Sequence, residues 1–277
     1  MGHGKLKKFA ENETFRCLLQ PDASAILNKE PGSRELRLND HAIKGQWGKE
    51  MFGNDNPIVL ELGCGKGDYT IALALRNPDV NYIGVDIKGA RLWKGAKFAT
   101  ENALPNVAFL RTRIEFIDAF FGLGEVSEIW LTFSDPQLRG SENARLSSPL
   151  FLERYRHFLK PDGVIHLKTD SRYLYEYTKA VVEVNDLPVF ANGTDIYHTP
   201  VILSEAKNLP IDMDVVLQVQ TFYEKMFLDM GLPITYMAFG LSHEGPYAFP
   251  GEAFDHEKWL EAEGPRRSFS HQPSKRG

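Results

Sequence analysis

Cysteine is scarce in this chain of 277 residues, which has only Cys17 and Cys64. Two cysteines give neither a disulfide framework nor a four-ligand zinc set, and a reducing cytoplasm is the simplest compartment for such a chain. No stretch approaches the roughly 20 apolar residues that a membrane helix needs. The first ten residues carry three lysines but no apolar run of the kind found in secretory signals. We therefore expect a cytoplasmic protein without a membrane segment.

A basic excess is also missing. The chain has 32 Lys and Arg against 37 Asp and Glu, for a net charge of −5. Nucleic-acid-binding domains usually show a basic excess, although a local basic patch can be sufficient. The histidines show no metal-ligand spacing, so we expect no metal site, and we expect a monomer. The 43% hydrophobic and 25% charged residues are ordinary for a globular protein with a sizeable core.

An α/β pattern begins at Ile58, where short β-branched runs alternate with segments of helical periodicity, as in parallel βαβ units. The predicted strands are Ile58–Leu62, Asn81–Val85, Val107–Arg111, Ile129–Phe133 and Val164–Lys168, with further strands near Pro188–Phe190 and Ile234–Phe239. The predicted helices are Asp68–Arg76, Ala90–Asn102, Pro149–Leu159 and Ser171–Val184, with another before the last strand. The tripeptide Pro161-Asp162-Gly163 predicts a turn.

Three segments are expected from this pattern. Residues 1–50 form a partly flexible N-terminal extension that is a candidate for RNA contact, and residues 51–241 form a single α/β domain. Residues 242–277 are rich in Gly, Pro, Ser and charge, which predicts a loosely held C-terminal tail.

A glycine loop is the strongest local signal. Gly63, Gly65 and Gly67 follow an apolar strand and precede a helix, where glycine allows a tight turn and close approach to a ligand. The dinucleotide pattern G-x-G-x-x-G places its third glycine three residues after the second, whereas the spacing here is G-x-G-x-G. Glu61, an acid before the first glycine, suits the charged amino acid end of S-adenosylmethionine (AdoMet), which has no pyrophosphate. The loop therefore favours AdoMet over NAD.

Asp86 ends the second predicted strand, where a carboxylate can hydrogen-bond both hydroxyls of a ribose. An acid there could also cap the next helix. Arg113 and Glu115, at the end of the third strand, lie in the segment expected beside an adenine, although they could simply pair with each other. Together with the glycine loop, Asp86 favours a nucleoside ligand.

Five motifs resemble the bacterial tRNA (guanine-N7-)-methyltransferase family, in order and at suitable spacing over about residues 40–240. They are Leu-Glu-Leu-Gly-Cys-Gly-Lys-Gly at 60–67, Gly-Val-Asp-Ile-Lys at 84–88, Phe-Ser-Asp-Pro at 133–136, His-Leu-Lys-Thr-Asp at 166–170 and Thr-Phe-Tyr-Glu at 221–224. Many methyltransferases share the first two, and the last three point to this family. The resemblance implies a single Rossmann-like class I methyltransferase domain, with a mostly parallel twisted sheet and helices on both faces.

The resemblance also implies residue roles. Glu61, Gly63, Gly65, Asp86, Arg113 and Asp135 would bind AdoMet. Asp135 would lie where cofactor and guanine meet, as the catalytic residue, while Arg139, Asp170, Thr221 and Glu224 would bind the guanosine of the tRNA. The family pattern after the fourth strand is Phe-Pro-Asp-Pro followed by lysines and arginines. Here Ser134 replaces the first proline, and residues 137–145 hold two arginines and Glu142.

Plain structural interpretations remain open for several of these residues. Asp135-Pro136 could be a loop turn, Asp170-Ser171 a helix start, and Thr221 with Glu224 a capping box. Tyr173, Tyr175 and Phe222 could stack on a base or fill the core, and the core is favoured for most of them. Asp135 and Asp170, however, both follow strands whose carboxyl ends face the ligand crevice of an open α/β sheet.

Methylation of guanine N7 needs no general base, because N7 carries a lone pair and no proton. The enzyme must hold N7, the methyl carbon and sulfur in line, and a carboxylate facing the ring edge could stabilise the positive charge that develops on the purine. Asp135, Asp170 and Glu224 are the candidates for this role. Two alternatives stay open: an AdoMet-dependent methyltransferase acting on a small molecule or protein, and a non-catalytic tRNA-binding protein.

Overall fold

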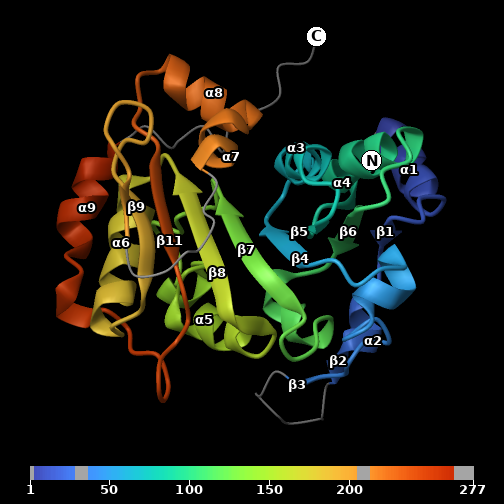
Figure 1. Ribbon diagram of the computed structural model, residues 1–277, viewed down its shortest axis with the longest axis horizontal. Helices are drawn as coiled ribbons and strands as arrows, with labels where there is room; N and C mark the ends of the chain where they lie inside the picture. Colours follow the sequence, from blue (N-terminus) through green and yellow to red (C-terminus); the bar gives the residue numbers. More distant parts are fainter. Residues whose placement is uncertain (1–2, 29–36, 205–212, 265–277) are drawn as a thin grey trace.

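The computed structural model describes residues 3–28, 37–204 and 213–264. Within these residues, one nine-stranded sheet runs in the order β1-β6-β5-β4-β7-β8-β11-β9-β10 (Figure 1). Its strands are β1 (Leu18–Leu19), β4 (Ile58–Leu62), β5 (Asn81–Asp86), β6 (Val107–Arg111), β7 (Val126–Thr132), β8 (Leu159–Thr169), β9 (Val189–Gly193), β10 (Ile202–Leu203) and β11 (Thr235–Phe239). The short β2 (Leu27–Asn28) and β3 (Arg37–Leu38) pair separately.

The helices alternate with the strands, as in βαβ units. They are α1 (His3–Asn12), α2 (Ala23–Ile26), α3 (Asp68–Arg76), α4 (Gly89–Glu101), α5 (Pro149–Arg156), α6 (Arg172–Val184), α7 (Met213–Gln218), α8 (Phe222–Asp229) and α9 (His256–Glu263). A π-helical turn covers Trp47–Phe52, and 3₁₀ turns cover Ile114–Ala119, Glu142–Ala144 and Gly251–Ala253. None of the described helices is long and apolar enough to cross a membrane.

The sheet is parallel from β1 to β8, and β11 is inserted antiparallel between β8 and β9. The chain runs outward from β4 to β5 and β6 on one side, and then returns to β7 on the other side of β4. The carboxyl ends of β4 and β7 therefore flank a topological switch point, the place where open α/β sheets bind ligands.

Successive side chains of each strand point to opposite faces, so the core has two parts. Leu60 and Leu62 of β4 belong to a cluster with side chains of α5 and α6. Val59, which precedes Leu60, points to the opposite face and belongs to a second cluster with side chains of α3 and α4. All five residues of β4 are buried, which is why the strand reads as a continuous apolar run broken only by Glu61.

The predicted α/β class is confirmed, and the main predicted strands and helices lie within a few residues of the observed ones. Two local expectations were wrong. Pro161-Asp162-Gly163 is no turn between elements but part of β8, where the pairing register with β7 shifts between Val126 and Glu128. Residues 242–264 are not loosely held: Tyr247 is buried, and α9 packs against α6. Residues 265–277 of the expected tail lie outside the described residues.

Candidate functional site

The glycine loop connects the end of β4 to α3. Gly63, Gly65 and Gly67 all have left-handed backbone conformations, with φ of +81°, +60° and +76°. The amides of Gly63 and Cys64 donate to the Val85 carbonyl on β5, at 2.8 and 3.1 Å. A Cβ on Gly63 or Gly65 would meet nothing within 4 Å, whereas one on Gly67 would lie 2.5 Å from the Phe109 ring. The first two glycines thus line open space, and the third is needed for packing.

Asp86 at the end of β5 is bound to this loop. Its Oδ2 accepts from the Gly65 amide at 3.0 Å, and its Oδ1 accepts from the Lys88 amide at 2.7 Å. The side chain is buried, so the two amides hold the carboxylate in one orientation beside the loop. Each carboxylate oxygen has a second lone pair for a further donor. This arrangement fits the ribose hydroxyls of a nucleoside.

Glu61 points into the protein and joins three elements. It accepts from the Thr70 amide at 2.9 Å, from the Thr70 hydroxyl, and from the Thr132 hydroxyl at 2.6 Å. Burial raises the pKa of Glu61 from 4.5 to about 7, and its three hydrogen bonds oppose that rise. The side chain therefore braces β4, α3 and β7 beneath the glycine loop. Its contact with a cofactor stays a prediction.

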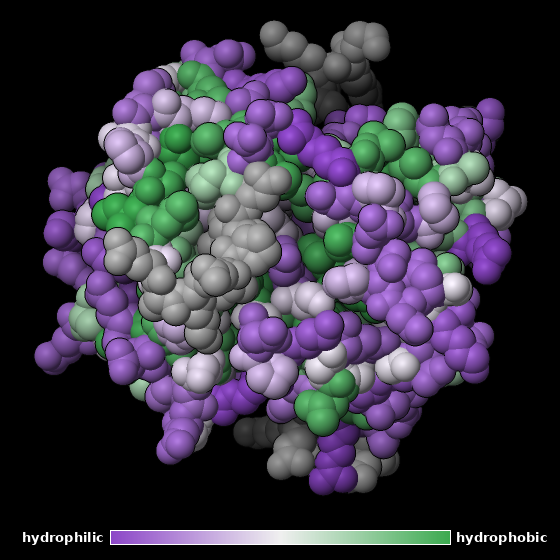
Figure 2. Space-filling model, viewed as in Figure 1, coloured by the Kyte–Doolittle hydropathy of each residue, from purple (hydrophilic) through white to green (hydrophobic). Residues whose placement is uncertain are grey.

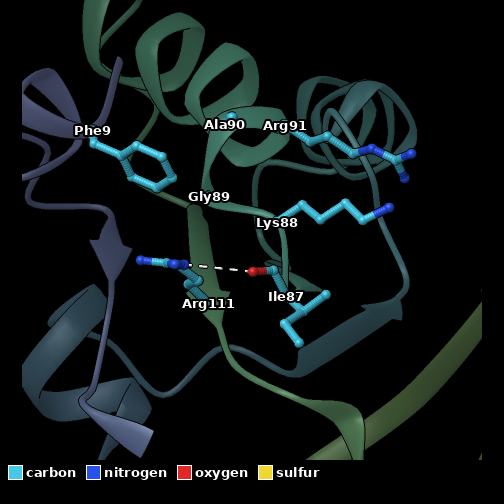
Figure 3. Close-up of a pocket in the computed structure, with 7 residues that line it drawn as sticks. All are labelled: Phe9, Ile87, Lys88, Gly89, Ala90, Arg91 and Arg111. Carbon is cyan, nitrogen blue, oxygen red and sulfur yellow. Dashed lines mark hydrogen bonds between the residues drawn. The ribbon is translucent and has the colours of Figure 1, made fainter. Parts of the chain in front are cut away.

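The expected adenine side is open and basic. Arg113 is exposed and pairs with Glu115 at 3.1 Å, which is the plain interpretation of these two residues. A recess of about 270 Å³ lies between α1 and the segment that leads from Asp86 into α4 (Figure 3). Its lining residues are Phe9, Ile87, Lys88, Gly89, Ala90, Arg91 and Arg111. The Arg111 guanidinium lies 5.2 Å from the Phe9 ring centroid and donates to the Ile87 carbonyl.

Asp135 lies in a strained loop after β7. Phe133 and Gln137 both have φ of +51°, a conformation that costs energy for residues with a side chain. Asp135 itself is exposed, and its Oδ1 accepts from the Gln137 amide at 2.9 Å. The Oγ of Ser134 is buried and has no hydrogen-bond partner within the described residues. Strain of this kind is retained where the surrounding structure holds it, and often at functional sites.

Arg145 holds the loop after Asp135 through hydrogen bonds to its backbone. Its guanidinium donates to the carbonyls of Pro136 at 3.1 Å and Gln137 at 3.4 Å, and to the Tyr173 hydroxyl at 2.7 Å. It is buried between the rings of Tyr173 and Tyr177, 5.0 and 4.5 Å from their centroids. Of the two arginines at 137–145, only the exposed Arg139 is available to contact a substrate.

Asp170 follows the neighbouring strand, β8, at the same end of the sheet. The Phe133 amide donates to the Lys168 carbonyl at 2.9 Å, which ties the two loops together where β7 and β8 end. Asp170 is half-buried, and Ser171, directly after it, caps α6 by accepting from the Leu174 amide. The structure thus brings the Asp135 and Asp170 loops side by side, next to the glycine loop at the end of β4.

Thr221 and Glu224 form the capping box that their spacing predicts. The Thr221 hydroxyl accepts from the Glu224 amide at 3.0 Å, and Glu224 accepts from the Thr221 amide at 3.3 Å. Glu224 is completely buried, and its Oε1 lies 2.6 Å from the Lys168 ammonium and 2.7 Å from the Tyr197 hydroxyl. Its expected contact with guanosine stays a prediction, and the contacts observed here fix the start of α8.

Lys168 was missed by the sequence reasoning. Its side chain is fully buried on β8 and donates to the carbonyls of Val216 and Val219 as well as to Glu224. Burial lowers the pKa of Lys168, and the charge of Glu224 opposes that effect. A lysine in the same strand as the apolar Val164, Ile165 and Leu167 was the available signal, because a buried charge requires a partner.

The aromatic candidates divide as the core interpretation predicts. Tyr173 and Tyr175 are buried on α6, whereas Phe222 at the start of α8 is 67% exposed. On the face seen in Figure 2, hydrophobic side chains gather over β9, and hydrophilic and hydrophobic side chains are mixed in the region of α1 and α4. Of Tyr173, Tyr175 and Phe222, it is the exposed Phe222 that is accessible to a base.

Comparisons with known proteins identify a methyltransferase family. Residues 55–229 match the model of a family described as putative methyltransferases. A Bacteroides thetaiotaomicron protein named tRNA (guanine-N(7)-)-methyltransferase is 48% identical over 88% of this chain and 88% of its own length. A protein of the same name from Cytophaga hutchinsonii is 40% identical over 86% of this chain and 98% of its own length.

Solved structures share the fold at low sequence identity. The crystal structure of the 16S rRNA methyltransferase KamB is 14% identical, with a TM-score of 0.51, and the likeness covers 75% of this chain and 96% of that one. At this identity the likeness supports the fold alone.

Proposed function

The chain belongs to the tRNA (guanine-N(7)-)-methyltransferase family, and we propose that it transfers the methyl group of AdoMet to N7 of a guanine in the variable loop of tRNA. The observation that carries this proposal is the convergence of three features at the ends of β4, β5, β7 and β8. These are the open glycine loop, the fixed Asp86 carboxylate and the paired Asp135 and Asp170 loops. The names of the relatives support the choice of acceptor.

The residues present fit AdoMet. Gly63 and Gly65 leave space where any side chain would project, and Asp86 has oxygen lone pairs for the ribose. When bound, AdoMet supplies a methyl group activated by its positively charged sulfur. Glu61 would lie at the amino acid end of AdoMet and bind it there, and Arg113 would lie on the adenine side of the cofactor. The loop spacing favours this ligand over a dinucleotide, whereas a ribose acid such as Asp86 would suit either.

The chain's own contribution to the reaction is orientation and electrostatics. Guanine N7 has a lone pair, so no residue has to remove a proton from it. Holding the reacting atoms in line can supply ~7–11 kcal/mol of the barrier. Asp135, exposed at the mouth of the crevice, would face the ring edge and stabilise the charge that develops on the purine. Asp170 would accept from guanine N1–H and the 2-amino group, a donor pattern that adenine does not have.

The tRNA would contact Arg139 in the loop at 137–145 and further basic side chains outside that loop. Arg139 is the exposed cation of that loop, because Arg145 is buried beneath it. Lys88, Arg91 and Arg111 line the recess beside α1, and Figure 3 shows Lys88 and Arg91 extending away from it. Phosphate contacts of this kind position an RNA without reading its sequence. The target guanine would have to leave its stack to reach the crevice, where Phe222 is exposed.

A methyl-transfer assay tests the proposal. The purified chain is incubated with labelled AdoMet and tRNA that lacks 7-methylguanosine, and the RNA is digested to nucleosides. We expect label in 7-methylguanosine, and its loss in Asp135→Ala and Asp170→Ala. Normal methylation by both variants would show that neither carboxylate takes part. AdoMet binding without any label in tRNA would direct the search to a small-molecule or protein acceptor, and RNA binding without AdoMet binding would support the non-catalytic alternative.

A further inference from the structure

The segment after β11 packs against the outer side of α6, where Figure 1 shows α9 lying beside it. Phe254 meets the rings of Tyr173 and Tyr177 edge-on, with centroids 5.1 and 5.4 Å away. The guanidinium of Arg172 lies 5.6 Å from the Trp259 ring. The contacts along α9 recur at helical spacing, so one face of the helix is directed at α6 and at the loops that α6 supports.

The first polar contact from α9 reaches the start of α6. Glu263 is buried, and its carboxylate accepts from the Ser171 hydroxyl at 2.7 Å and from the Tyr173 amide at 3.0 Å. The first amides of a helix have no partner within the helix, and a carboxylate there also interacts favourably with the helix dipole. Because Ser171 gives its proton to Glu263, its oxygen is directed to the Leu174 amide. Glu263 thereby fixes the turn that begins directly after Asp170.

The second polar contact reaches the other loop through a relay of side chains. The Nδ1 of His256 lies 2.6 Å from the Tyr173 hydroxyl, which accepts from Arg145 at 2.7 Å. The hydroxyl proton is therefore available to His256. Arg145 in turn holds the carbonyls of Pro136 and Gln137, immediately after Asp135. The two ends of α9 thus connect to the two loops that carry the candidate catalytic carboxylates.

We propose that α9 is a positioning element for the guanosine side of the site, in which Glu263 orients the Asp170 loop and His256 orients the Asp135 loop. This proposal rests on the proposed function, because it assigns the two loops to the guanosine. The contacts that Glu263 and His256 make with Ser171 and Tyr173 lie beside the Asp170 and Asp135 loops, so we expect α9 to act on the acceptor side and to leave the AdoMet side unchanged. The strained φ values at Phe133 and Gln137 make the Asp135 loop dependent on such support.

The test uses the full chain with Glu263→Gln and His256→Phe. The first removes the charge from the buried carboxylate, and the second keeps an aromatic ring against Tyr173 but removes the nitrogen. Glu261→Gln and Glu257→Gln are the matched controls, because both glutamates are exposed on the same helix. Hydrogen exchange is measured over residues 134–138 and 170–174, AdoMet binding by calorimetry, and methyl transfer to tRNA as kcat and KM.

We expect faster exchange at 170–174 in Glu263→Gln and at 134–138 in His256→Phe. AdoMet affinity should stay unchanged in both, while kcat/KM for tRNA falls about tenfold or more in Glu263→Gln, as for loss of a hydrogen bond to a charged group. The effect of His256→Phe should be smaller, because His256 is exposed. The controls should match the wild type.

Exchange at both loops equal to that of the controls would overturn the proposal. So would a parallel loss of AdoMet affinity and thermal stability, which would show that α9 merely supports the whole domain. If the wild-type chain does not methylate tRNA, the proposed function fails, yet the exchange data still report whether α9 holds the two loops. If the Glu263→Gln chain does not fold, the exchange measured for His256→Phe, at the exposed start of the helix, tests the proposal.

Discussion

Lys168 and Glu224 form a salt bridge inside the protein, with Nζ and Oε1 2.6 Å apart and both side chains completely buried. Lys168 stands on β8, two residues before Asp170, and Glu224 stands in the first turn of α8. The pair therefore fastens α8 to the strand that leads into the site. The contacts of Lys168 with the carbonyls of Val216 and Val219 fasten the end of α7 and the connection after it in the same way.

Removing one member of this pair should be costly. Glu224→Ala leaves the Lys168 charge buried without its partner, and we expect a loss of roughly 3–5 kcal/mol of folding free energy. The double variant Lys168→Met with Glu224→Leu should recover part of that loss, because apolar residues of similar volume replace the pair, while the Val216 and Val219 carbonyls still lose their donor. Urea unfolding followed by circular dichroism measures both. Lys225→Ala, at an exposed position on the same helix, is the control. An unchanged unfolding midpoint for Glu224→Ala would contradict the structural role.

The same double variant separates stability from substrate contact at Glu224. If Glu224 only fixes α8, a stable double variant should retain methyl transfer to tRNA. A stable but inactive double variant would instead indicate that the Glu224 carboxylate moves to meet the guanosine during the reaction.

Asp86 should decide the affinity for AdoMet. Its two oxygens are oriented by the amides of Gly65 and Lys88, so the carboxylate needs no rearrangement to accept from a ribose. Asp86→Ala removes both acceptors, and we expect AdoMet affinity to fall at least about a hundredfold, as for two hydrogen bonds to a charged group. Asp86→Asn should fall less. Calorimetry measures the affinity, with Asp79→Ala, an exposed acid, as the control. Unchanged affinity in Asp86→Ala would exclude the ribose role.

The sheet and the glycine loop could be predicted from sequence because their signals are local. The strands Ile58–Leu62 and Val107–Arg111 were predicted to the residue, since buried parallel strands read as short apolar runs with sharp ends. The glycine spacing and Asp86 likewise occupy the ends of neighbouring strands, whose order follows from the βαβ pattern. Predicting these features required no knowledge of distant contacts.

The acceptor side could be predicted only in outline, because its supports are distant in sequence. From sequence alone, Arg145 is as good a candidate for substrate binding as Arg139. The fold shows instead that it packs against Tyr173 and Tyr177. Glu263 stands 92 residues from Ser171, in a segment whose composition suggested a loose tail. Composition describes how a segment behaves alone, whereas helix α9 is held by contacts with α6 that no local pattern contains.

Glu61 should make the stability of the protein depend on pH in an unusual direction. Burial raises the pKa of its carboxyl from 4.5 to about 7, so the folded state keeps the proton over a range in which the unfolded chain releases it. The stabilising contribution is complete below pH 4.5 and is lost as pH rises to about 7. The loss is on the order of 3 kcal/mol.

Glu61→Gln should remove this dependence, because the amide does not titrate. Urea unfolding of the wild type and the variant at pH 5 and pH 8 measures it, and the wild type should lose more stability over this interval than the variant does. Equal changes in the two proteins would show that Glu61 is ionised in the folded state throughout this range.

Gly65→Ala and Gly67→Ala should separate ligand binding from packing within one loop. Both positions have positive φ, which costs an alanine about 1–2 kcal/mol. At Gly67 the added methyl would also lie 2.5 Å from the buried Phe109 ring, so the total cost should reach roughly 2–5 kcal/mol.

At Gly65 the methyl enters open space, and that space is where we expect AdoMet to bind. Gly65→Ala should therefore lose only the backbone cost of about 1–2 kcal/mol in stability. It should bind AdoMet at least about tenfold more weakly, because the methyl takes up room that the ligand needs. Gly67→Ala should show its main loss in stability. Wild-type AdoMet affinity in Gly65→Ala would mean that the loop faces solvent and that the cofactor binds elsewhere along the strand ends.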